Sequence, residues 1–312
     1  MALTPSTPHT VVILLATLNG ARFLDAQLDS LVAQTHTDWR LVASDDGSSD
    51  QTLTILRDFA AKHPEKVRLA VGPGRGFARH FMHLMQHAPP APYIALCDQD
   101  DVWRPDKLAR AVDHLHPVPH TTPALYCART LITTKDLTPL RVSDHFTKAP
   151  DFRNALVQSI GGGNTMVMNQ SAHALAAWAA PRCPDPIAHD WWLYQIMSSC
   201  GGVVLRDAEP VLFYRQHGGN QIGARQSRWA AIGRALSILG GRWRRWNPIS
   251  LAALAPVAPK MTPKARQILQ DYVGARSGSM LRRLASLRRA RVYRQGVVGT
   301  AALYLLCALG RL

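Results

Sequence analysis

The sequence predicts an α/β fold with a mostly parallel sheet, a mixed second half and a basic helical extension at the C-terminus. Three observations predict it. Short apolar strands alternate with amphipathic helices over roughly the first hundred residues, the pattern of strand–helix–strand units. Polar or acidic segments follow several of these strands. Near Gly223 the composition changes, and acidic residues become rare beyond it.

The first half alternates regularly between the two element types. Apolar positions three or four residues apart indicate helices, and short apolar runs between turn residues indicate strands. Asp50 can cap the second helix, and a proline opens the fourth. The predicted strands are Val11–Ala16, Arg40–Ser44, Val67–Val71 and Pro92–Cys97, and the predicted helices are Arg22–Gln34, Gln51–Ala61, Phe77–His87 and one that starts at Pro105.

From about residue 120 the alternation is less regular. We expect mixed or antiparallel pairing in this part, which would form the other side of a cleft. The predicted strands are Leu125–Ala128, Thr165–Met168, Val203–Leu205 and Val211–Tyr214, and the predicted helices are Ser171–Ala180 and Asp190–Ser199.

Size and cysteine content narrow the class of protein. The 312 residues, 47% of them apolar, can bury a core of one large or two small domains. The five cysteines lack CxxC spacing, which argues against a disulfide framework or a zinc site and favours a reducing, cytosolic compartment. The apolar run 11–18 is short, so we interpret it as a core strand and not as a signal peptide.

Charge is divided unevenly along the chain. Residues 1–224 hold 19 Lys and Arg against 20 Asp and Glu, whereas residues 225–312 hold 17 Lys and Arg against one acid, Asp271. We therefore expect a nearly neutral domain over 1–224, with halves at about 10–115 and 116–224, followed by a separate basic region over 225–312.

Three carboxylates lie close together at the end of the fourth predicted strand, in Cys97-Asp98-Gln99-Asp100-Asp101. The negative charges repel one another there, and burial costs them hydration. A bound cation would offset both costs. Oxygen ligands suit Mg²⁺ or Mn²⁺, which proteins hold with one or two carboxylates plus substrate phosphates. The alternative is a helix cap or a solvated acidic loop. Apolar residues on both sides favour the metal site and a phosphorylated substrate.

Two other segments follow predicted strands, at the sheet edge where ligands bind in open α/β folds. Asp45 and Asp46 could accept the imide N–H of uracil or thymine, or a ribose hydroxyl, or they could only order a turn. The glycine-rich segment 72–76 lacks the GK[ST] ending of a P-loop. Arg75 or Arg79 could still meet a phosphate there, although a plain turn is an equal alternative.

Later segments offer further candidates. Gly162, Gly163 and Asn164 let the backbone approach a ligand closely, or they form a flexible loop. Asp190 lies at a predicted helix start beside His189, Trp191 and Trp192. This combination indicates a general base in a pocket whose rings stack on sugars. The alternative is an acidic helix cap with buried aromatic rings.

The segment Tyr214-Arg215-Gln216-His217-Gly218-Gly219-Asn220 follows the last predicted strand. His217 could supply a nitrogen ligand to the same metal, and Arg215 could meet a phosphate.

Together these motifs resemble the family 2 glycosyltransferases with a GT-A fold, in particular the rhamnosyltransferase-like branch that builds bacterial surface polysaccharides. The resemblance covers about residues 10–225. It is carried, in order, by Ala16-Thr17-Leu18-Asn19-Gly20, Ser44-Asp45-Asp46-Gly47-Ser48-Ser49-Asp50, Cys97–Trp103 with Pro105-Asp106-Lys107, His189-Asp190-Trp191-Trp192 and Tyr214–Asn220.

The resemblance implies a role for each motif. The first half would bind a dTDP- or UDP-sugar, with Thr17, Asn19, Asp45, Asp46 and Gln99 at the nucleotide. Asp98 and Asp100 would form the DXD-type element that binds Mg²⁺ or Mn²⁺ on the donor diphosphate. Asp190 matches the catalytic base, and His217 matches an additional metal ligand of some members.

The reaction implied by the resemblance inverts the anomeric centre. The sugar, for which rhamnose is the expectation, would pass to a glycan or lipid-linked glycan in cell-surface synthesis, including O-antigen. Gly162, Gly163, Asn164, Trp191 and Trp192 would shape the acceptor pocket. The processive QxxRW element is absent from the sequence, so we expect one sugar to be added per binding event.

The basic region suggests a membrane surface. Trp229, Trp243 and Trp246 lie among many arginines, and residues 296–310 form an apolar stretch shorter than a bilayer span. Anionic lipid would hold the enzyme on the inner face of the plasma membrane. The alternative is a helical extension that packs on the domain or joins two copies in a homodimer. We do not expect nucleic-acid binding, because the motifs of the domain point to catalysis.

Two other functions remain as alternatives. The run from Asp98 to Val102 also fits the DxDx[VT] pattern of haloacid-dehalogenase-like phosphohydrolases, in which the first Asp is a nucleophile. That pattern leaves Asp45, Asp46 and Asp190 unexplained. A membrane-bound scaffold without catalysis is the second alternative.

Overall fold

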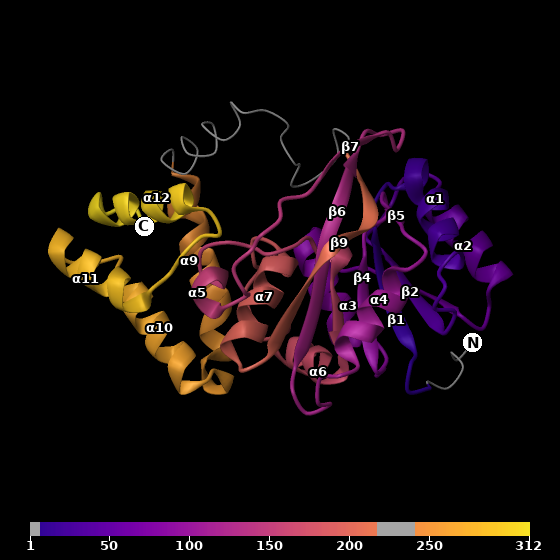
Figure 1. The fold of residues 1–312 in the computed structure, drawn as a ribbon. Helices are drawn as coiled ribbons and strands as arrows, with labels where there is room; N and C mark the ends of the chain where they lie inside the picture. Colours follow the sequence, from indigo (N-terminus) through magenta and orange to yellow (C-terminus); the bar gives the residue numbers. More distant parts are fainter. Residues whose placement is uncertain (1–6, 217–240) are drawn as a thin grey trace.

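A computed structural model describes residues 7–216 and 241–312 of the chain (Figure 1). Its first half follows the predicted alternation, and β3 and α3 have the predicted bounds. The elements are β1 (Val11–Thr17), α1 (Ala21–Val32), β2 (Trp39–Asp45), α2 (Thr52–Lys62), β3 (Val67–Val71), α3 (Phe77–His87), β4 (Tyr93–Cys97), β5 (Val102–Trp103) and α4 (Lys107–Leu115).

Two predicted helix starts need correction. The fourth helix begins at Lys107 and not at Pro105, because the Pro105 carbonyl accepts a hydrogen bond from Thr35 N (2.9 Å) in a different loop. Asp50 lies one residue before the capping position of α2. Its carboxylate nevertheless accepts the Thr52 N–H at 3.0 Å, so it satisfies a donor of the first turn.

The second half contains β6 (Ala124–Thr133), β7 (Pro139–Val142), α5 (Phe152–Ala155), η1 (Gly163–Thr165), β8 (Val167–Asn169), α6 (Gln170–Ala179), α7 (His189–Ser199) and β9 (Val203–Arg215). The two predicted strands after residue 203 are one strand, β9. It stays paired with β6 across irregularities near Pro210, where proline cannot donate a ladder hydrogen bond.

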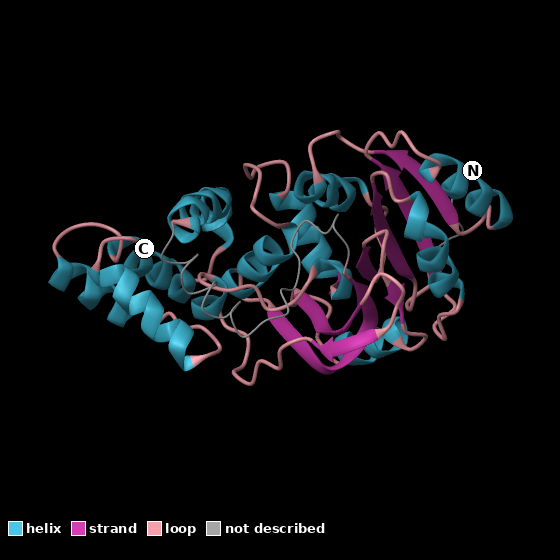
Figure 2. Ribbon diagram, turned by 90° about the horizontal axis from the view of Figure 1, so that it is seen from above, coloured by secondary structure: helices cyan, strands magenta, loops and turns pink. Residues whose placement is uncertain are grey.

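All of these strands belong to one sheet, in the order β3-β2-β1-β4-β8-β6-β9-β5, with β7 paired to β6. The first four strands are parallel neighbours. β8 joins antiparallel to β4 and β6, and β5 joins antiparallel to β9. The parallel first half and mixed second half are therefore confirmed. Figure 2 shows the strands as one curved sheet with helices on both sides.

Helices cover both faces of the sheet. In β1, Val12 and Leu14 face a core shared with α3, α6 and α7, whereas Val11, Ile13 and Leu15 face a core shared with α1, α2 and α4. This alternation follows from the two-residue period of a strand. Because both faces are buried, the strand ends are the part of the sheet left for chemistry.

The C-terminal region is helical over its described part, as predicted. It contains α9 (Arg242–Leu254), η2 (Ala255–Lys260), α10 (Pro263–Gly274), α11 (Met280–Ala290) and α12 (Val297–Ala308). Figure 1 shows these helices at one end of the molecule, beyond α7. Leu254, Tyr272, Leu287 and Leu306 join the same core as α7. The predicted boundary at residue 224 lies outside the described residues.

No described helix combines the length and apolar content needed to cross a bilayer. Within the apolar stretch 296–310, α12 packs Leu303, Leu306 and Cys307 into the core. Val297 and Val298 on the same helix are each 80% exposed. One side of this helix therefore packs on the protein while apolar side chains remain at its surface.

Candidate active site

The predicted site residues of the first half gather where parallel strands end side by side. Thr17, the last residue of β1, pairs with Asp45, the last residue of β2. On the other side of β1, Leu15 pairs with Cys97 at the end of β4. The loops that begin at Leu18, Asp46 and Asp98 therefore leave the same edge of the sheet.

Asp45 orders the loop after β2. Its carboxylate accepts hydrogen bonds from Thr17 Oγ1 (2.9 Å), Ser48 Oγ (2.6 Å), Ser48 N (2.8 Å) and Gly47 N (3.1 Å). A carboxylate offers about four acceptor positions. These contacts favour the turn-ordering alternative for Asp45, and they hold Thr17 against the same loop.

Asn19 connects the loops after β1 and β2. Its N–H donates to Ser48 Oγ and its Oδ1 accepts the Ser49 N–H, both at 2.8 Å. Its backbone is left-handed, with φ 50°, a conformation that asparagine tolerates better than most residues. The asparagine of the first motif thus fixes the shape of the predicted nucleotide site.

Asp46 lies between two loops and α3. Its Oδ1 accepts the Gly74 N–H at 2.6 Å and lies 4.0 Å from His80 Nδ1. Burial lowers the pKa of His80, so its ring is mainly neutral at pH 7. A Cβ on Gly72 would lie 2.4 Å from Asp46 Oδ1. Glycine at this position lets the loop pass beside the carboxylate.

Arg75 and Arg79, predicted to meet a phosphate, both contact Asp185. Arg75 Nη2 lies 3.1 Å from Asp185 Oδ2. Arg79 Nε donates to Asp185 Oδ1 at 2.6 Å, and its Nη2 also donates to the Cys183 carbonyl at 3.0 Å. The two guanidinium groups therefore connect α3 and the loop before it to the segment before α7.

Gln99 joins the acidic loop to the loop after β1. Its Oε1 accepts the Leu18 N–H (2.8 Å) and its Nε2 donates to the Leu18 carbonyl (3.0 Å). A Cβ on Gly20 would lie 2.2 Å from Gln99 Oε1. Glycine at position 20 thus leaves the space that the Gln99 side chain needs to bond the Leu18 backbone.

The acidic loop concentrates charge in a partly enclosed place. Asp98 is partly exposed, and burial together with the nearby charges of Asp100 and Asp190 raises its pKa to about 7. Asp101 is fully buried. Asn164 Nδ2 donates a hydrogen bond to Asp101 Oδ2. The other carboxylate oxygen, Asp101 Oδ1, is buried without a hydrogen-bond partner. Burial and the neighbouring acids raise the pKa of Asp101 well above its usual range.

Lys107 is a site residue that sequence reasoning missed. Its side chain is fully buried at the start of α4, with Nζ 2.6 Å from the Asn164 carbonyl and 3.0 Å from the Trp103 ring centroid. Burial lowers its pKa to about 7, against the attraction of Cys97, Asp101 and Asp98. The only sequence signal was the position of Lys107 just after the acidic motif, where it was taken as part of a helix opening.

Arg215 supplies a second positive charge. It lies two residues beyond Phe213, which pairs with Val102, and it is close enough to Asp100 and Asp101 to interact electrostatically. Its Nη1 donates to the Lys135 carbonyl at 2.6 Å. A lysine and an arginine from distant parts of the chain thus offset the three carboxylates.

Asp190, at the start of α7, faces the acidic loop. Burial raises its pKa to about 6, while N–H groups of Trp191 and Gly163 donate to its carboxylate and oppose that rise. The charge of Asp190 in turn raises the pKa of Asp98. The predicted catalytic base and the predicted metal ligand are therefore neighbours, although many residues separate them in the chain.

The glycines before β8 make room for the residues beside Asp190. A Cβ on Gly163 would lie 2.1 Å from His189 Nε2, and a Cβ on Gly162 would lie 2.7 Å from Asn164 Oδ1. His189 stacks on Phe81 with ring centroids 4.1 Å apart, and burial lowers its pKa to about 3. A neutral histidine, packed against Phe81, thus immediately precedes the predicted base in α7.

The predicted sugar-stacking role of Trp191 and Trp192 does not match their burial. Trp191 is 7% exposed and Trp192 is 1% exposed, and both join the core. Trp191 Nε1 donates to the Ala155 carbonyl at 2.7 Å. Buried rings offer no face to a sugar, so the alternative of buried aromatic residues describes this pair.

The residues present fit a divalent cation bound jointly with substrate. Among residues 7–216 and 241–312, no group of three or more His, Cys, Asp or Glu side chains is arranged to hold a metal by itself. His217 lies outside the described residues. Mg²⁺ and Mn²⁺ need only one or two carboxylates when phosphates complete the shell. Burial and the neighbouring acids disfavour the ionised form of Asp98 and raise its pKa to about 7, and a cation bound there would favour that ionised form.

Comparison with solved structures supports the fold. The chain is similar to the S. aureus TarS fragment 1–349 in complex with UDP-GlcNAc, with a TM-score of 0.53, 14% identity, and coverage of 96% of this chain and 92% of that one. A structure of GalNAc-T7 with UDP, GalNAc and Mn²⁺ gives a TM-score of 0.50 at 11% identity, covering 91% of this chain and 55% of that one. The predicted GT-A fold is confirmed.

Sequence comparison identifies the family. The chain is 27% identical over 246 residues to a dTDP-rhamnosyl transferase, RfbG, of Shigella flexneri, covering 76% of this chain and 83% of that protein. Residues 12–173 match the family described as Glycosyl transferase family 2. This match takes in Asp45, Asp98 and Lys107. The chain is a glycosyltransferase and belongs to glycosyl transferase family 2.

Proposed function

We propose that this glycosyltransferase inverts the anomeric centre and transfers rhamnose from dTDP-rhamnose to a glycan or lipid-linked glycan in bacterial cell-surface synthesis. The observation that carries the proposal is the proximity of Asp98, in the loop after β4, to Asp190, in the first turn of α7. The similarity to a dTDP-rhamnosyl transferase supports the donor. A UDP-sugar is the second donor class, as in the TarS complex.

Asp190 would act as the general base. With a pKa of about 6, it is mainly ionised at pH 7 and still basic enough to take a proton. It would remove the proton from the acceptor hydroxyl, whose oxygen attacks the anomeric carbon as the bond to the diphosphate breaks. The N–H groups of Gly163 and Trp191 would keep the carboxylate oriented.

Asp98 and Asp100 would hold Mg²⁺ or Mn²⁺ against the donor diphosphate. The cation would stabilise negative charge on the departing nucleoside diphosphate. Lys107 and Arg215 would limit repulsion among the carboxylates before the donor binds. Thr17, Asn19, Asp45, Asp46 and Gln99 would maintain the loops around the nucleotide through the hydrogen bonds described above.

The basic region would hold the enzyme at the inner surface of the plasma membrane, near a lipid-linked acceptor. Its described helices carry many exposed arginines, and α12 carries exposed apolar side chains. Such a combination suits an interfacial position.

The test is a calorimetric titration of the purified protein with dTDP, UDP and GDP, each with and without Mn²⁺. We expect dTDP to bind in a Mn²⁺-dependent manner, and Asp98→Asn to lose this dependence. Binding of UDP alone would change the donor class. If no nucleotide binds and simple phosphoesters are hydrolysed, the transfer proposal fails and the phosphohydrolase alternative returns.

A further inference from the structure

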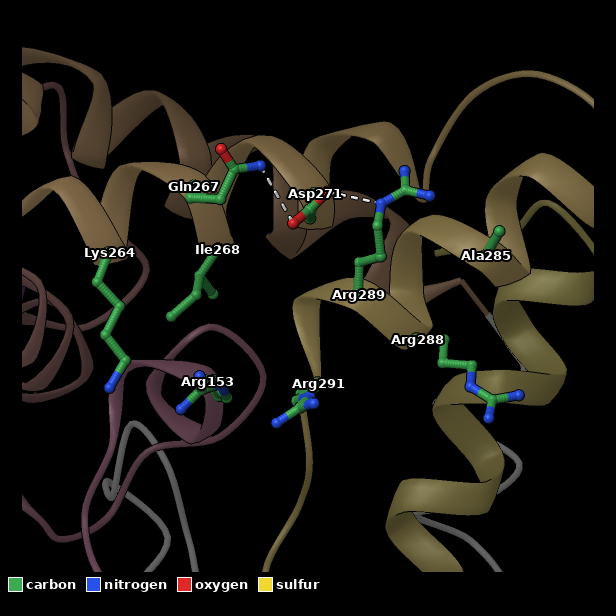
Figure 3. Close-up of a pocket in the computed structure, with 9 residues that line it drawn as sticks. All are labelled: Arg153, Lys264, Gln267, Ile268, Asp271, Ala285, Arg288, Arg289 and Arg291. Carbon is green, nitrogen blue, oxygen red and sulfur yellow. Dashed lines mark hydrogen bonds and ion pairs between the residues drawn. The ribbon is translucent and has the colours of Figure 1, made fainter.

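A concave site lies far from the acidic loop, between the C-terminal helices and α5. Its volume is about 720 Å³ (Figure 3). The ionisable side chains that line it come from α5, α10, α11 and the residue that ends α11. They are Arg153, Lys264, Asp271, Arg288, Arg289 and Arg291.

Most of the positive charge in this cavity has no internal compensation. Its single carboxylate, Asp271, already pairs with Arg289 at 3.1 Å. Arg153 Nη1 lies 3.2 Å from Asp151, but its Nε is buried without a hydrogen-bond partner. Within the described ranges, Lys264 and Arg291 form no ion pair. Cations held together in this way attract an anion.

The side chains are placed to act together. Figure 3 shows Lys264, Arg153 and Arg291 on one side of the cavity, whereas Arg288 points away from them. Lys264 and Arg291 are exposed, and Arg153 is partly buried. Guanidinium and ammonium groups on one wall suit a phosphate, whose oxygens accept several charge-assisted hydrogen bonds.

Arg291 occupies an unusual backbone position. It ends α11 in the left-handed conformation, with φ 52° and ψ 31°. Glycine is favoured at this place because it has no Cβ penalty. A glycine substitution can therefore remove the guanidinium without straining the turn.

Exposed apolar side chains on α11, which lines the cavity, and on the neighbouring α12 favour a lipid as the source of the phosphate. Met280 and Leu281 at the start of α11 are 51% and 76% exposed, and Leu305 and Leu309 near the end of α12 are 52% and 54% exposed. Arg283 Nε on α11 donates to the Cys307 carbonyl on α12 at 2.9 Å, so these two helix ends adjoin. Exposed apolar groups beside cations are typical of a lipid interface.

We propose that this cavity binds the phosphate of an anionic phospholipid headgroup, with Arg153, Lys264 and Arg291 as the phosphate contacts. The site would fix how the enzyme lies on the membrane. This inference rests on the proposed membrane attachment and is independent of the transfer chemistry.

The test is flotation of the full-length protein with phosphatidylcholine vesicles that contain or lack phosphatidylglycerol. The cavity variant is Lys264→Gln/Arg291→Gly. The matched control is Arg266→Gln/Arg282→Gln, which removes two exposed cations from the same helices, outside the cavity. We expect binding to phosphatidylglycerol vesicles to fall at least about tenfold further in the cavity variant than in the control.

Each other outcome overturns the proposal. Equal losses in the two variants would mean that net charge alone binds the membrane. Unchanged vesicle binding of the cavity variant, together with loss of thermal stabilisation by inorganic phosphate, would assign the site to free phosphate. Calorimetric binding of dTDP with Mn²⁺ in the same samples shows whether the active site is intact, so failure of the transfer proposal is seen separately.

Discussion

The acidic edge and the basic cavity each gather charge of one sign, but they compensate it differently. At the edge, Asp101 and Lys107 are both fully buried. The negative charge of the carboxylates there is therefore offset by a side chain of the protein itself. In the cavity, Lys264 and Arg291 are exposed and unpaired within the described ranges. A buried charge needs an opposite charge nearby for the protein to fold, because it has lost its hydration. An exposed charge stays hydrated and needs no partner until a ligand binds. Substitutions should therefore affect stability or turnover at the edge, and only binding at the cavity.

The largest effect is expected at Asp190. Asp190→Asn keeps an oxygen that can accept the N–H groups of Gly163 and Trp191, but it cannot take a proton. We expect turnover to fall about 10²–10⁴-fold, with dTDP affinity in the presence of Mn²⁺ unchanged. Initial transfer rates and calorimetry measure the two quantities. Full turnover in this variant would remove Asp190 as the base.

Lys107→Met should reduce stability most. It leaves Asp101 and Asp98 without their buried cation, and removing one member of a buried pair costs about 3–5 kcal/mol. The pKa of Lys107 is lowered to about 7 because burial disfavours its charged form. Removing the buried ammonium relieves that cost and offsets part of the loss at pH 7. Urea unfolding measures it, with the exposed Lys62→Met as control. Equal stability of both variants would mean that Lys107 does not stabilise the acidic edge.

His189 should make the fold sensitive to acid. Its pKa is about 3 in the folded protein and 6.5 in the unfolded chain. Between these values only the unfolded chain takes up the proton, so stability falls as the pH falls. The slope is at most about 1.4 kcal/mol per pH unit. His189→Phe keeps a ring against Phe81 and should lose this contribution, which unfolding at pH 7 and pH 5 will measure. Identical pH slopes would contradict it.

Gly20→Ala should cost less, because the Cβ meets the flexible end of Gln99. We expect a loss of about 1–2 kcal/mol as Gln99 leaves the Leu18 backbone. Gln99→Ala should cost about 1 kcal/mol, and the double variant less than the sum of the two. Urea unfolding of the three variants tests this coupling. Strictly additive losses would mean that the two residues act independently.

Arg291→Gly should give the smallest change in stability. We expect it to lie within about 0.5 kcal/mol of the wild type, because glycine fits the left-handed turn. Thermal unfolding measures it. A loss well above 1 kcal/mol would show that the guanidinium stabilises the fold, and the contrast with the acidic edge would disappear.

Regular elements were predictable because their signals are local. The sequence pattern predicted α3 with its observed bounds, Phe77–His87. The bounds of β9 were not predictable, because pairing with β6 continues across Pro210, and that pairing is a tertiary interaction. The choice between a ligand pocket and buried rings for Trp191 and Trp192 was left open for the same reason. Tryptophan in a sequence indicates equally a ligand pocket or a core.

The sequence by itself determined the order of strands and helices, the acidic motif, the family and the concentration of cations after residue 224, since periodicity and composition are properties of neighbouring residues. The tertiary structure decided which charges meet. It brought Asp190 to Asp98, brought Lys107 close to Asp98 and Asp101, and left Lys264 and Arg291 around one cavity. Electrostatic interactions depend on distance and burial, and distant segments acquire both only when the chain folds.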